Sequence, residues 1–223
     1  MTALSVDSLI ALGFVLGLRH ALDADHLAAI STIVTERRSL LSSLLVGASW
    51  GLGHTIALLV AGVGVLLLRY HLTDRIAHVL ELCVGIMLVF LGTNVLRTLL
   101  GRDVGHTPAR TTVAPHSHAH GWVVTRPLLV GMVHGLAGSA PLLLLAITAM
   151  ASPLAAFSYI AVFGVGSMIG MALTSVLVSV PARFTVERFA RTHLALRGFS
   201  GVFSVGLGLL IVYENGVLNP LFA

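Results

Sequence analysis

The segment GLRHALDADHLAAI, residues Gly17–Ile30, carries five ionisable side chains inside a long apolar run. In chain order they are Arg19, His20, Asp23, Asp25 and His26. A charge at the centre of a lipid bilayer costs about 2.5–3.5 kcal/mol on insertion scales. A cluster of this kind therefore requires a polar cavity, pairing among its members, or a bound ligand.

The spacing of these residues restricts how they can share a ligand. On a regular helix, His20, Asp23 and His26 drift by about 60° per step, and Asp25 points away from them. A regular helix thus cannot direct His20, Asp25 and His26 at one ion. Either the helix unwinds within the segment, or other helices complete the site. A simpler interpretation pairs Arg19 with Asp23 one turn on, which leaves the two histidines without a role.

The composition of the whole chain is that of a membrane protein. Of its 223 residues, 57% are apolar and 10% are charged, and the mean hydropathy is +0.98. Soluble domains carry about 25% charged residues. This composition excludes a soluble enzyme, a nucleic-acid binder and a disordered scaffold. The single cysteine, Cys83, excludes a disulfide framework.

We predict an all-α integral membrane protein with about six transmembrane helices. Their approximate bounds are 6–33, 40–68, 77–99, 127–151, 154–180 and 196–214. Of the 13 arginines, ten lie in the first, third and fifth linkers or at their edges, and only two lie in the second linker. The positive-inside rule then predicts that the odd-numbered linkers are cytoplasmic and that both termini are outside.

The two halves of the chain resemble each other. The segment Gly17–Ile30 aligns with GMVHGLAGSAPLLL (residues 131–144), and this alignment pairs His20 with His134. In the same way, GLGH (51–54) aligns with GVGS (164–167). Further along, a pair of glycines seven residues apart recurs in the third and sixth segments. Three spans per half is an odd number, so the halves are expected to form a 3+3 inverted repeat. This predicts a first three-helix repeat with the metal motif (1–100), a His-containing cytoplasmic linker (101–125) and a second three-helix repeat (126–223).

The side chains of the cluster suit a divalent metal ion. Imidazole nitrogens and carboxylate oxygens are ligands of first-row divalent metals, and the lack of thiolates argues against copper(I) and structural zinc. His54 lies in the middle of the second segment, where it is either a ligand or a hydrogen-bond partner of a neighbouring helix. His134 is a further candidate ligand, supported by its alignment with His20 and by its depth in the fourth segment.

The segment RHALDADHLAAI (Arg19–Ile30) resembles the hallmark of the nickel/cobalt transporter family, a histidine followed after four residues by Asp-His. LGHTIALL (52–59), with Gly53, His54 and Thr55, resembles the Gly-His-Ser/Thr hallmark of the next span. The later acidic motif of that family is absent. In its place stands MVHGLAGSAPLL (132–143), which resembles the short six-span, urease-associated nickel permease branch.

The resemblance implies a secondary transporter that moves Ni²⁺ or Co²⁺ into the cell across the cytoplasmic membrane. By matching position, His20, Asp25 and His26 would be the principal metal ligands, with His54 contributing from the second span. Asp23 and His134 are the further candidates from the residue analysis. The expected partners are a divalent metal ion and the lipid bilayer, with no nucleic acid, and the metal is the cargo, so that no cofactor is expected.

Two other functions are weighed against import. The first is nickel or cobalt efflux through the same intramembrane site, with loading from the histidines of the linker, which are His106, His116, His118 and His120. The second is a membrane metalloenzyme, which would typically present His-Glu-x-x-His, and that pattern does not occur. Nor does the phosphate-binding GxxxxGK[S/T] pattern, so we expect no nucleotide hydrolysis by this chain.

Overall fold

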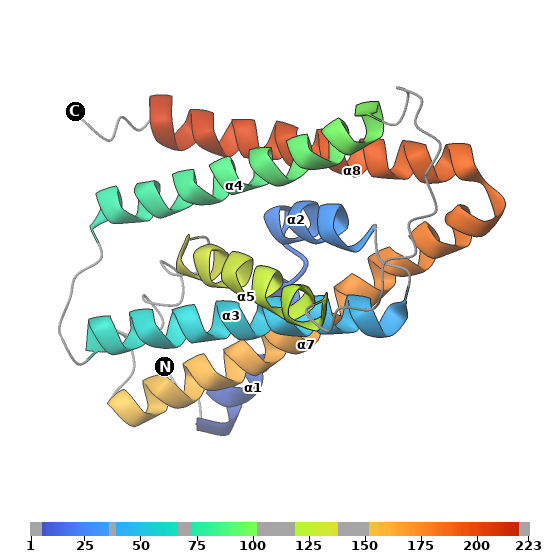
Figure 1. Cartoon of the computed structure of the whole chain (residues 1–223). Coiled ribbons are helices and arrows are strands. Elements are labelled where there is room, and N and C mark those ends of the chain that lie inside the picture. The colour runs from blue at the N-terminus through green and yellow to red at the C-terminus, as the bar shows by residue number, and fades with distance from the viewer. Residues whose placement is uncertain (1–5, 36–38, 67–72, 102–118, 138–151, 219–223) are drawn as a thin grey trace.

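A computed structural model describes residues 6–35, 39–66, 73–101, 119–137 and 152–218 of the chain. These residues form seven α-helices and a short π-helix, and no strand occurs among them (Figure 1). The elements are α1 (Val6–His20), α2 (Ala24–Val34), α3 (Leu40–Leu66), α4 (Asp74–Leu100), α5 (Ala119–Ala137), α7 (Pro153–Arg188), α8 (Ala190–Tyr213) and η2 (Glu214–Leu218). The prediction of an all-α protein is confirmed.

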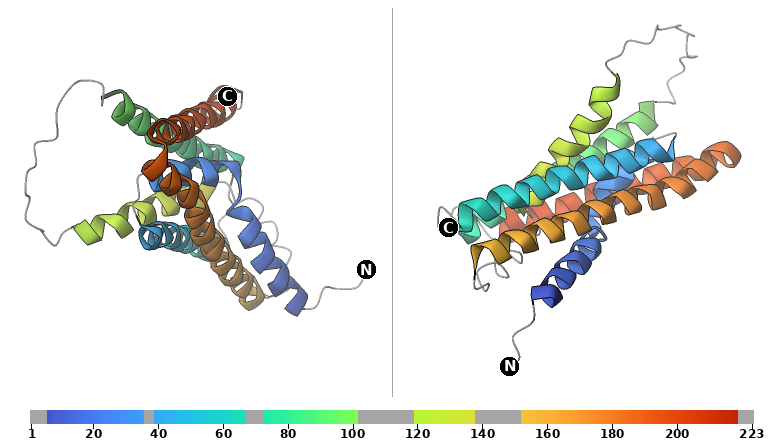
Figure 2. Two further views of the ribbon diagram at one scale, coloured as in Figure 1. Left: turned by 90° about the vertical axis from the view of Figure 1, so that its right-hand side faces the viewer. Right: turned by 90° about the horizontal axis from the view of Figure 1, so that it is seen from below.

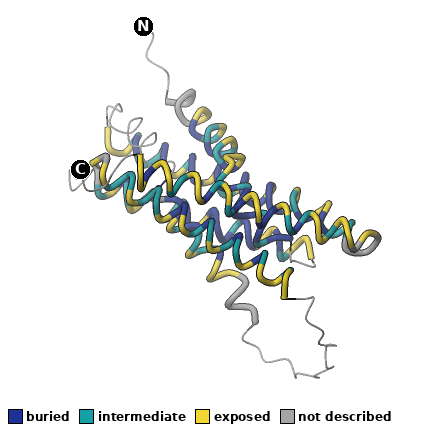
Figure 3. Tube along the Cα trace, turned by 90° about the horizontal axis from the view of Figure 1, so that it is seen from above, coloured by how far each residue is buried: buried dark blue, intermediate teal, exposed yellow. Residues whose placement is uncertain are grey.

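Helix α2 lies at the centre of the molecule, with longer helices around it (Figure 2). It contacts α3, α4, α7 and α8. Outside it, α3 packs against both α5 and α7, α1 packs along α7, and α4 packs along α8. Buried residues gather where these helices lie against one another (Figure 3). The core around α2 includes Ile30, Val46, Trp50, Leu88 and Met171.

Four helices in the described part of the chain are long and apolar enough to cross a bilayer. They cover Leu40–Gly64, Arg75–Leu100, Pro153–Thr185 and Arg191–Leu218. These helices coincide with the second, third, fifth and sixth predicted segments. Their lipid-compatible surface is large, because many big apolar side chains on them are exposed, such as Phe90 and Leu177.

The first predicted segment, 6–33, is two helices instead of one. Helix α1 ends at His20, residues 21–23 form a turn, and α2 begins at Ala24. Asp23 occupies the N-cap position of α2 with extended backbone angles, φ −61° and ψ 147°. Aspartate is favoured at N-caps, and a second carboxylate, Asp25, lies in the first turn, where the helix dipole favours negative charge. The spacing predicted either that the helix unwinds within this segment or that other helices complete the site. The structure shows that the helix does unwind here.

The fourth predicted segment starts earlier than expected. Helix α5 begins at Ala119, within the region predicted to be a linker, and continues through the buried Pro127 to Ala137. Most of the predicted linker lies outside the described residues, since residues 102–118 are not described. The second half of the fourth segment, residues 138–151, lies outside them as well. Helix α7 begins as a capped helix, since the Ser152 hydroxyl accepts a hydrogen bond from the backbone N–H of Ala155 at 3.2 Å.

Helices α4 and α8 approach each other through facing glycines. A Cβ atom on Gly92 would lie 2.6 Å from the carbonyl oxygen of Gly201, and one on Gly208 would lie 2.6 Å from the carbonyl oxygen of Gly85. Small residues at such positions let helix backbones pack closely in lipid. The first half contributes Gly85 and Gly92, and the second half contributes Gly201 and Gly208. These are the glycines that recur seven residues apart in the two halves of the sequence.

We expect the substitution Gly208→Ala to destabilise the α4–α8 pair. The added methyl group would overlap backbone atoms, and overpacking of this kind costs about 1–3 kcal/mol. The measurement is the thermal unfolding temperature of the purified protein in detergent. Gly206→Ala is the matched control, because a Cβ atom there has no other atom within 4 Å among the described residues. Equal unfolding temperatures for the two variants would contradict this account of the contact.

Candidate metal site

The break between α1 and α2 brings the first set of site residues together. His20 is the last residue of α1, whereas Asp25 and His26 lie in the first turn of α2. Leu22 and Asp23 close the turn between them through backbone hydrogen bonds to the carbonyl groups of Arg19 and His20, at 2.9 and 3.1 Å. Because α2 begins in a new direction after this turn, the side chains of His20 and His26 can face each other.

Two further histidines reach the site from α3 and α5. Glycines allow these two helices to pack at very close range, since a Cβ atom on Gly53 would collide with the backbone of Leu128 and one on Gly131 with the backbone of Trp50. This contact buries His54 of α3 and His134 of α5 completely, each with 0% of its surface exposed.

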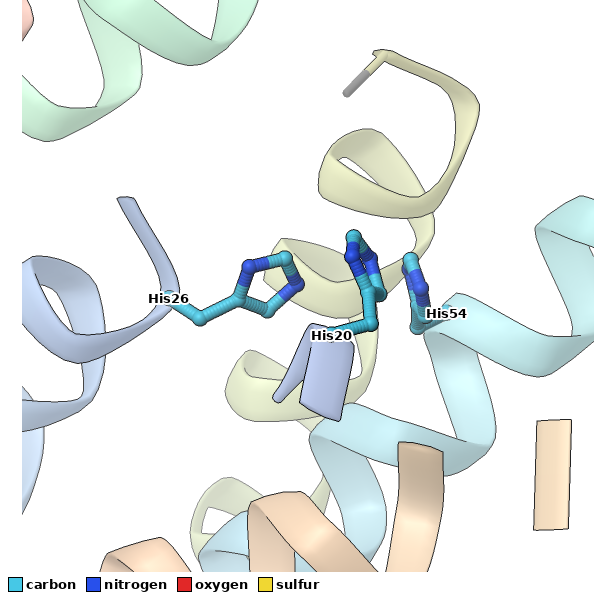
Figure 4. A group of neighbouring side chains, drawn as sticks. All are labelled: His20, His26 and His54. Atoms are coloured by element: carbon cyan, nitrogen blue, oxygen red, sulfur yellow. The ribbon is translucent and has the colours of Figure 1, made fainter. Parts of the chain in front are cut away.

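Three imidazole rings form the first candidate group (Figure 4). His20, His26 and His54 each offer a ring nitrogen, and these atoms lie within 4.8 Å of one another. The rings of His20 and His54 are stacked with centroids 5.1 Å apart and an interplanar angle of 22°. The ring of His26 meets both edge-on, with centroids 4.5 Å from His20 and 5.5 Å from His54. Three helices thus supply one imidazole each, from α1, α2 and α3.

A carboxylate and two imidazoles form a second group that shares His26 with the first. Its members are Asp25, His26 and His134, again with ligand atoms within 4.8 Å. The Oδ1 atom of Asp25 lies 3.1 Å from Nδ1 of His26 and accepts a hydrogen bond from the His26 backbone N–H at 2.9 Å. The Oδ2 atom lies 2.8 Å from Nε2 of His134. One carboxylate therefore links α2 to α5.

Asp23 lies at the outer edge of the cluster. Its side chain is 53% exposed, and its Oδ2 atom lies 2.7 Å from Nδ1 of His20. In the described part of the chain, Asp23 pairs with His20 and not with Arg19, so the simpler Arg19–Asp23 interpretation is wrong. The reason is the turn, because it replaces the regular helix on which Arg19 and Asp23 would be one turn apart.

Several ring nitrogens of the cluster are buried and lack a hydrogen-bond partner among the described residues. They are Nε2 of His20, Nε2 of His26, both ring nitrogens of His54 and Nδ1 of His134. A buried polar atom without a partner costs about 1–3 kcal/mol. These atoms are concentrated in one place, and the lone pair of an unprotonated ring nitrogen can bind a metal ion.

Aromatic residues that the sequence analysis did not single out complete the walls. Trp50 is fully buried, stacks on His26 at a centroid distance of 5.9 Å and meets His134 edge-on at 5.7 Å. Phe163 of α7 covers His20 at 5.6 Å. Trp50 precedes His54 by four residues, which places both side chains on one face of α3. This spacing is the feature of the sequence from which a contact of Trp50 with the site could have been predicted.

The structure brings all six sequence-predicted residues into one connected cluster. His20, His26 and His54 form the first group, Asp25 and His134 join it through His26, and Asp23 joins it through His20. Their role as metal ligands stays a prediction at this point. The donor set of nitrogen and oxygen atoms matches divalent first-row metals, and Cys83 is exposed on α4 and belongs to neither group.

Long apolar helices around a buried cluster of histidines and carboxylates define a multi-pass membrane protein with a site of metal-ligand chemistry. The chain belongs to the NicO family, described as high-affinity nickel-transport protein, whose family model matches residues 6–188. That range includes every residue of the cluster. The chain is therefore a nickel-transport protein rather than an enzyme, and the metal ion is its transported substrate rather than a cofactor. The resemblance drawn from the two sequence motifs is confirmed.

Individual relatives agree with this assignment. The urease accessory protein UreH of Bacillus sp. (strain TB-90) is 34% identical over 218 residues, which cover 96% of this chain and 95% of that protein. The chloroplast proteins FOR GROWTH AND FERTILITY 1 and 2 of Arabidopsis thaliana are 29% and 28% identical. This chain spans 59% and 55% of their respective lengths. No solved structure matches the chain.

Proposed function

We propose that this protein imports Ni²⁺, with Co²⁺ as a second cargo, across the cytoplasmic membrane, and that the ion binds within the cluster of six residues. The observation that carries the proposal is the set of buried ring nitrogens without partners, contributed by His20, His26 and His54. Nickel and cobalt accept the same imidazole and carboxylate ligands and differ mainly in their rank of affinity. A cluster of this chemistry therefore suits both ions.

We also propose six spans, arranged as a 3+3 inverted repeat. The first span is the broken pair α1–α2, and the second half comprises a span that begins with α5, followed by α7 and α8. The helix contacts support this arrangement, because exchanging the halves turns the α3–α5 contact into the α7–α1 contact. The same exchange maps the α3–α7 and α4–α8 contacts onto themselves. The two repeats then correspond to residues 1–100 and 126–223, and the cytoplasmic linker 101–125 between them includes the start of α5, which begins at Ala119.

Individual glycine contacts support the repeat independently. A Cβ atom on Gly53 would meet the carbonyl oxygen of Leu128, and one on Gly166 would meet the carbonyl oxygen of Phe14. Phe14 and Leu128 correspond in the alignment that pairs His20 with His134. Gly53 and Gly166 correspond in the alignment of GLGH with GVGS. Equivalent contacts in the two halves are what a two-fold relation between them requires.

The orientation proposed for the chain has both termini outside the cell and the odd-numbered linkers in the cytoplasm. Ten of 13 arginines lie in or beside those linkers, in agreement with the positive-inside rule. Helix α2 has 11 residues, which at 1.5 Å per residue spans about 16 Å, or half of a hydrocarbon core. The cluster at the start of α2 would then lie close to the middle of the membrane, where transporters of this plan bind their substrates.

The direction of transport is tested by radiolabelled Ni²⁺ uptake into cells that express the protein. Expressing cells are expected to accumulate more label than empty cells, and His20→Ala is expected to remove the excess. A surplus of unlabelled Co²⁺ is expected to suppress uptake by competition. Lower accumulation than in empty cells, restored by His20→Ala, would instead mean efflux through the same site.

A deletion separates import from efflux further. Removal of residues 106–120, which contain the linker histidines, is expected to leave Ni²⁺ uptake close to the wild-type rate. An exporter loaded through these histidines would lose its ability to protect cells against toxic nickel. No difference between expressing and empty cells in either assay would contradict the nickel function.

A further inference from the structure

We propose that a hollow between α2, α4 and α5 binds an anionic phospholipid of the cytoplasmic leaflet. The hollow has a volume of about 730 Å³ and lies where α4 passes α2 and α5 (Figure 1). A smaller hollow of about 300 Å³ adjoins it on α4, because Phe90 and Asn94 line both. None of the described residues that line the two hollows belongs to the histidine cluster. The proposal uses the orientation proposed for the chain but not its nickel function.

Large apolar side chains border the two hollows and are exposed at the surface of the helices. Phe90 of α4 is 70% exposed, and Ile86 of α4 and Leu129 of α5 are exposed as well. The acyl chains of lipids are as apolar as these side chains. In a bilayer the apolar part of each hollow is therefore open to a lipid chain, which can lie along α4.

Polar side chains line the same two hollows. Arg126 of α5 and Asn94 of α4 line the larger one, and Asn94 and Arg97 of α4 line the smaller one. No acidic residue is among the described residues that line either hollow. A guanidinium group has five N–H donors in a planar fork and binds phosphate oxygens in pairs. The charge of the hollows thus favours a phosphate group and disfavours the Ni²⁺ cargo as the occupant.

The positions of these residues match the depth of one leaflet. Ile86 and Arg97 are eleven residues apart on α4, which corresponds to about 16 Å, or half of a hydrocarbon core of about 30 Å. Arg97 lies in the last turn of α4, before the third linker, and Arg126 directly precedes the predicted fourth segment. Both arginines are therefore expected at the cytoplasmic interface, where basic pockets between transmembrane helices bind anionic head groups.

Native mass spectrometry of the purified full chain, titrated in detergent with either of two lipids, tests the proposal. The lipids are phosphatidylglycerol, which is anionic, and phosphatidylcholine, which carries no net charge. We expect Arg97→Gln and Arg126→Gln each to lower the affinity for phosphatidylglycerol about fivefold, since a basic residue near an anionic lipid contributes about 1 kcal/mol. The wild type should accordingly prefer phosphatidylglycerol to phosphatidylcholine by about 25-fold, the product of the two effects.

Two further variants make the test specific to this hollow. Arg191→Gln is the matched control, because Arg191 is exposed at the start of α8, in the fifth linker, and lines neither hollow. It should bind phosphatidylglycerol as the wild type does. Leu129→Trp keeps the charge but places a larger side chain at the border of the hollow. It should lower the affinity for phosphatidylglycerol although both arginines remain.

Three results would overturn the proposal. The first is equal affinity of the wild type for the two lipids. The second is a loss in Arg191→Gln as large as that in Arg126→Gln, which would mean general attraction to basic side chains. The third is a dimer that persists without added lipid and dissociates in Leu129→Trp, because a second copy of the chain would then cover this face. None of these measurements contains nickel, so their failure is distinct from a failure of the proposed transport function.

Discussion

Substitution of His26 by alanine is expected to abolish nickel transport. His26 is the one residue common to both candidate groups, since it faces His20 and His54 on one side and contacts Asp25 on the other. It is buried, with only 2% of its surface exposed. Removing a residue behind a metal ligand costs about 10–100-fold in affinity or activity. Loss of the ligand itself should exceed this, and we expect more than about a 100-fold decrease in the rate of Ni²⁺ uptake.

Two further variants make this experiment specific. His26→Gln keeps a polar side chain of similar length but lacks the imidazole, and it should fail as His26→Ala does. His78→Gln is the matched control, because His78 lies on α4 and bonds Asn215 at 2.8 Å, outside the cluster. It should transport at close to the wild-type rate. Uptake by both His26 variants at more than half of the wild-type rate would exclude this histidine from the transport site.

The second large effect is expected from Gly135→Ala. A methyl group there would lie 2.6 Å from Nδ1 of His54 and 2.6 Å from the His54 carbonyl oxygen. Neither the ring nor the backbone of α3 can retreat easily, because His54 is fully buried. Overpacking of a well-packed contact costs about 1–3 kcal/mol. Displacement of the ring from its orientation towards His20 and His26 should lower Ni²⁺ affinity by tenfold or more, since about 1.4 kcal/mol corresponds to a factor of ten.

The control for this prediction is the same substitution in a glycine without neighbours. A Cβ atom on Gly64 of α3 has no atom within 4 Å among the described residues, so Gly64→Ala should leave Ni²⁺ affinity unchanged. Both variants are compared by equilibrium Ni²⁺ binding and by the amount of folded protein after purification. Normal affinity in Gly135→Ala would mean that the contact of α5 with His54 does not orient the ring.

Much of the fold follows from local features of the sequence. The long apolar runs predict α3, α4, α7 and α8, because a helix that spans a bilayer needs about 20 apolar residues. Few other structures can satisfy their backbone hydrogen bonds inside a bilayer. The spacing of the ionisable residues leaves a break in the first segment as one of two alternatives. The signal for it was Asp23 followed by Asp25, an N-cap aspartate and an acidic residue in the first helical turn.

The site was predictable as a set of residues but not as a network. An ionisable side chain inside a membrane costs free energy, so such residues are rare there. This rarity distinguishes His20, Asp25 and His26 in the sequence. The bond between Asp25 and His134, 109 residues apart, depends on the approach of α5 to α2 and has no local signal. The wall formed by Trp50 was missed for a related reason: an apolar ring in an apolar helix is ordinary until the histidines that it covers are known.

The central claim is that this chain alone moves Ni²⁺ through the histidine cluster, and influx into liposomes that contain only the purified protein tests it most directly. An inside-negative potential should drive the ion inwards by about 4.6 kcal/mol per 100 mV for its two charges. We predict radiolabelled Ni²⁺ accumulation above that of protein-free liposomes, faster at a larger potential and absent with His26→Ala. Accumulation equal to that of protein-free liposomes, or undiminished in His26→Ala, would contradict the account.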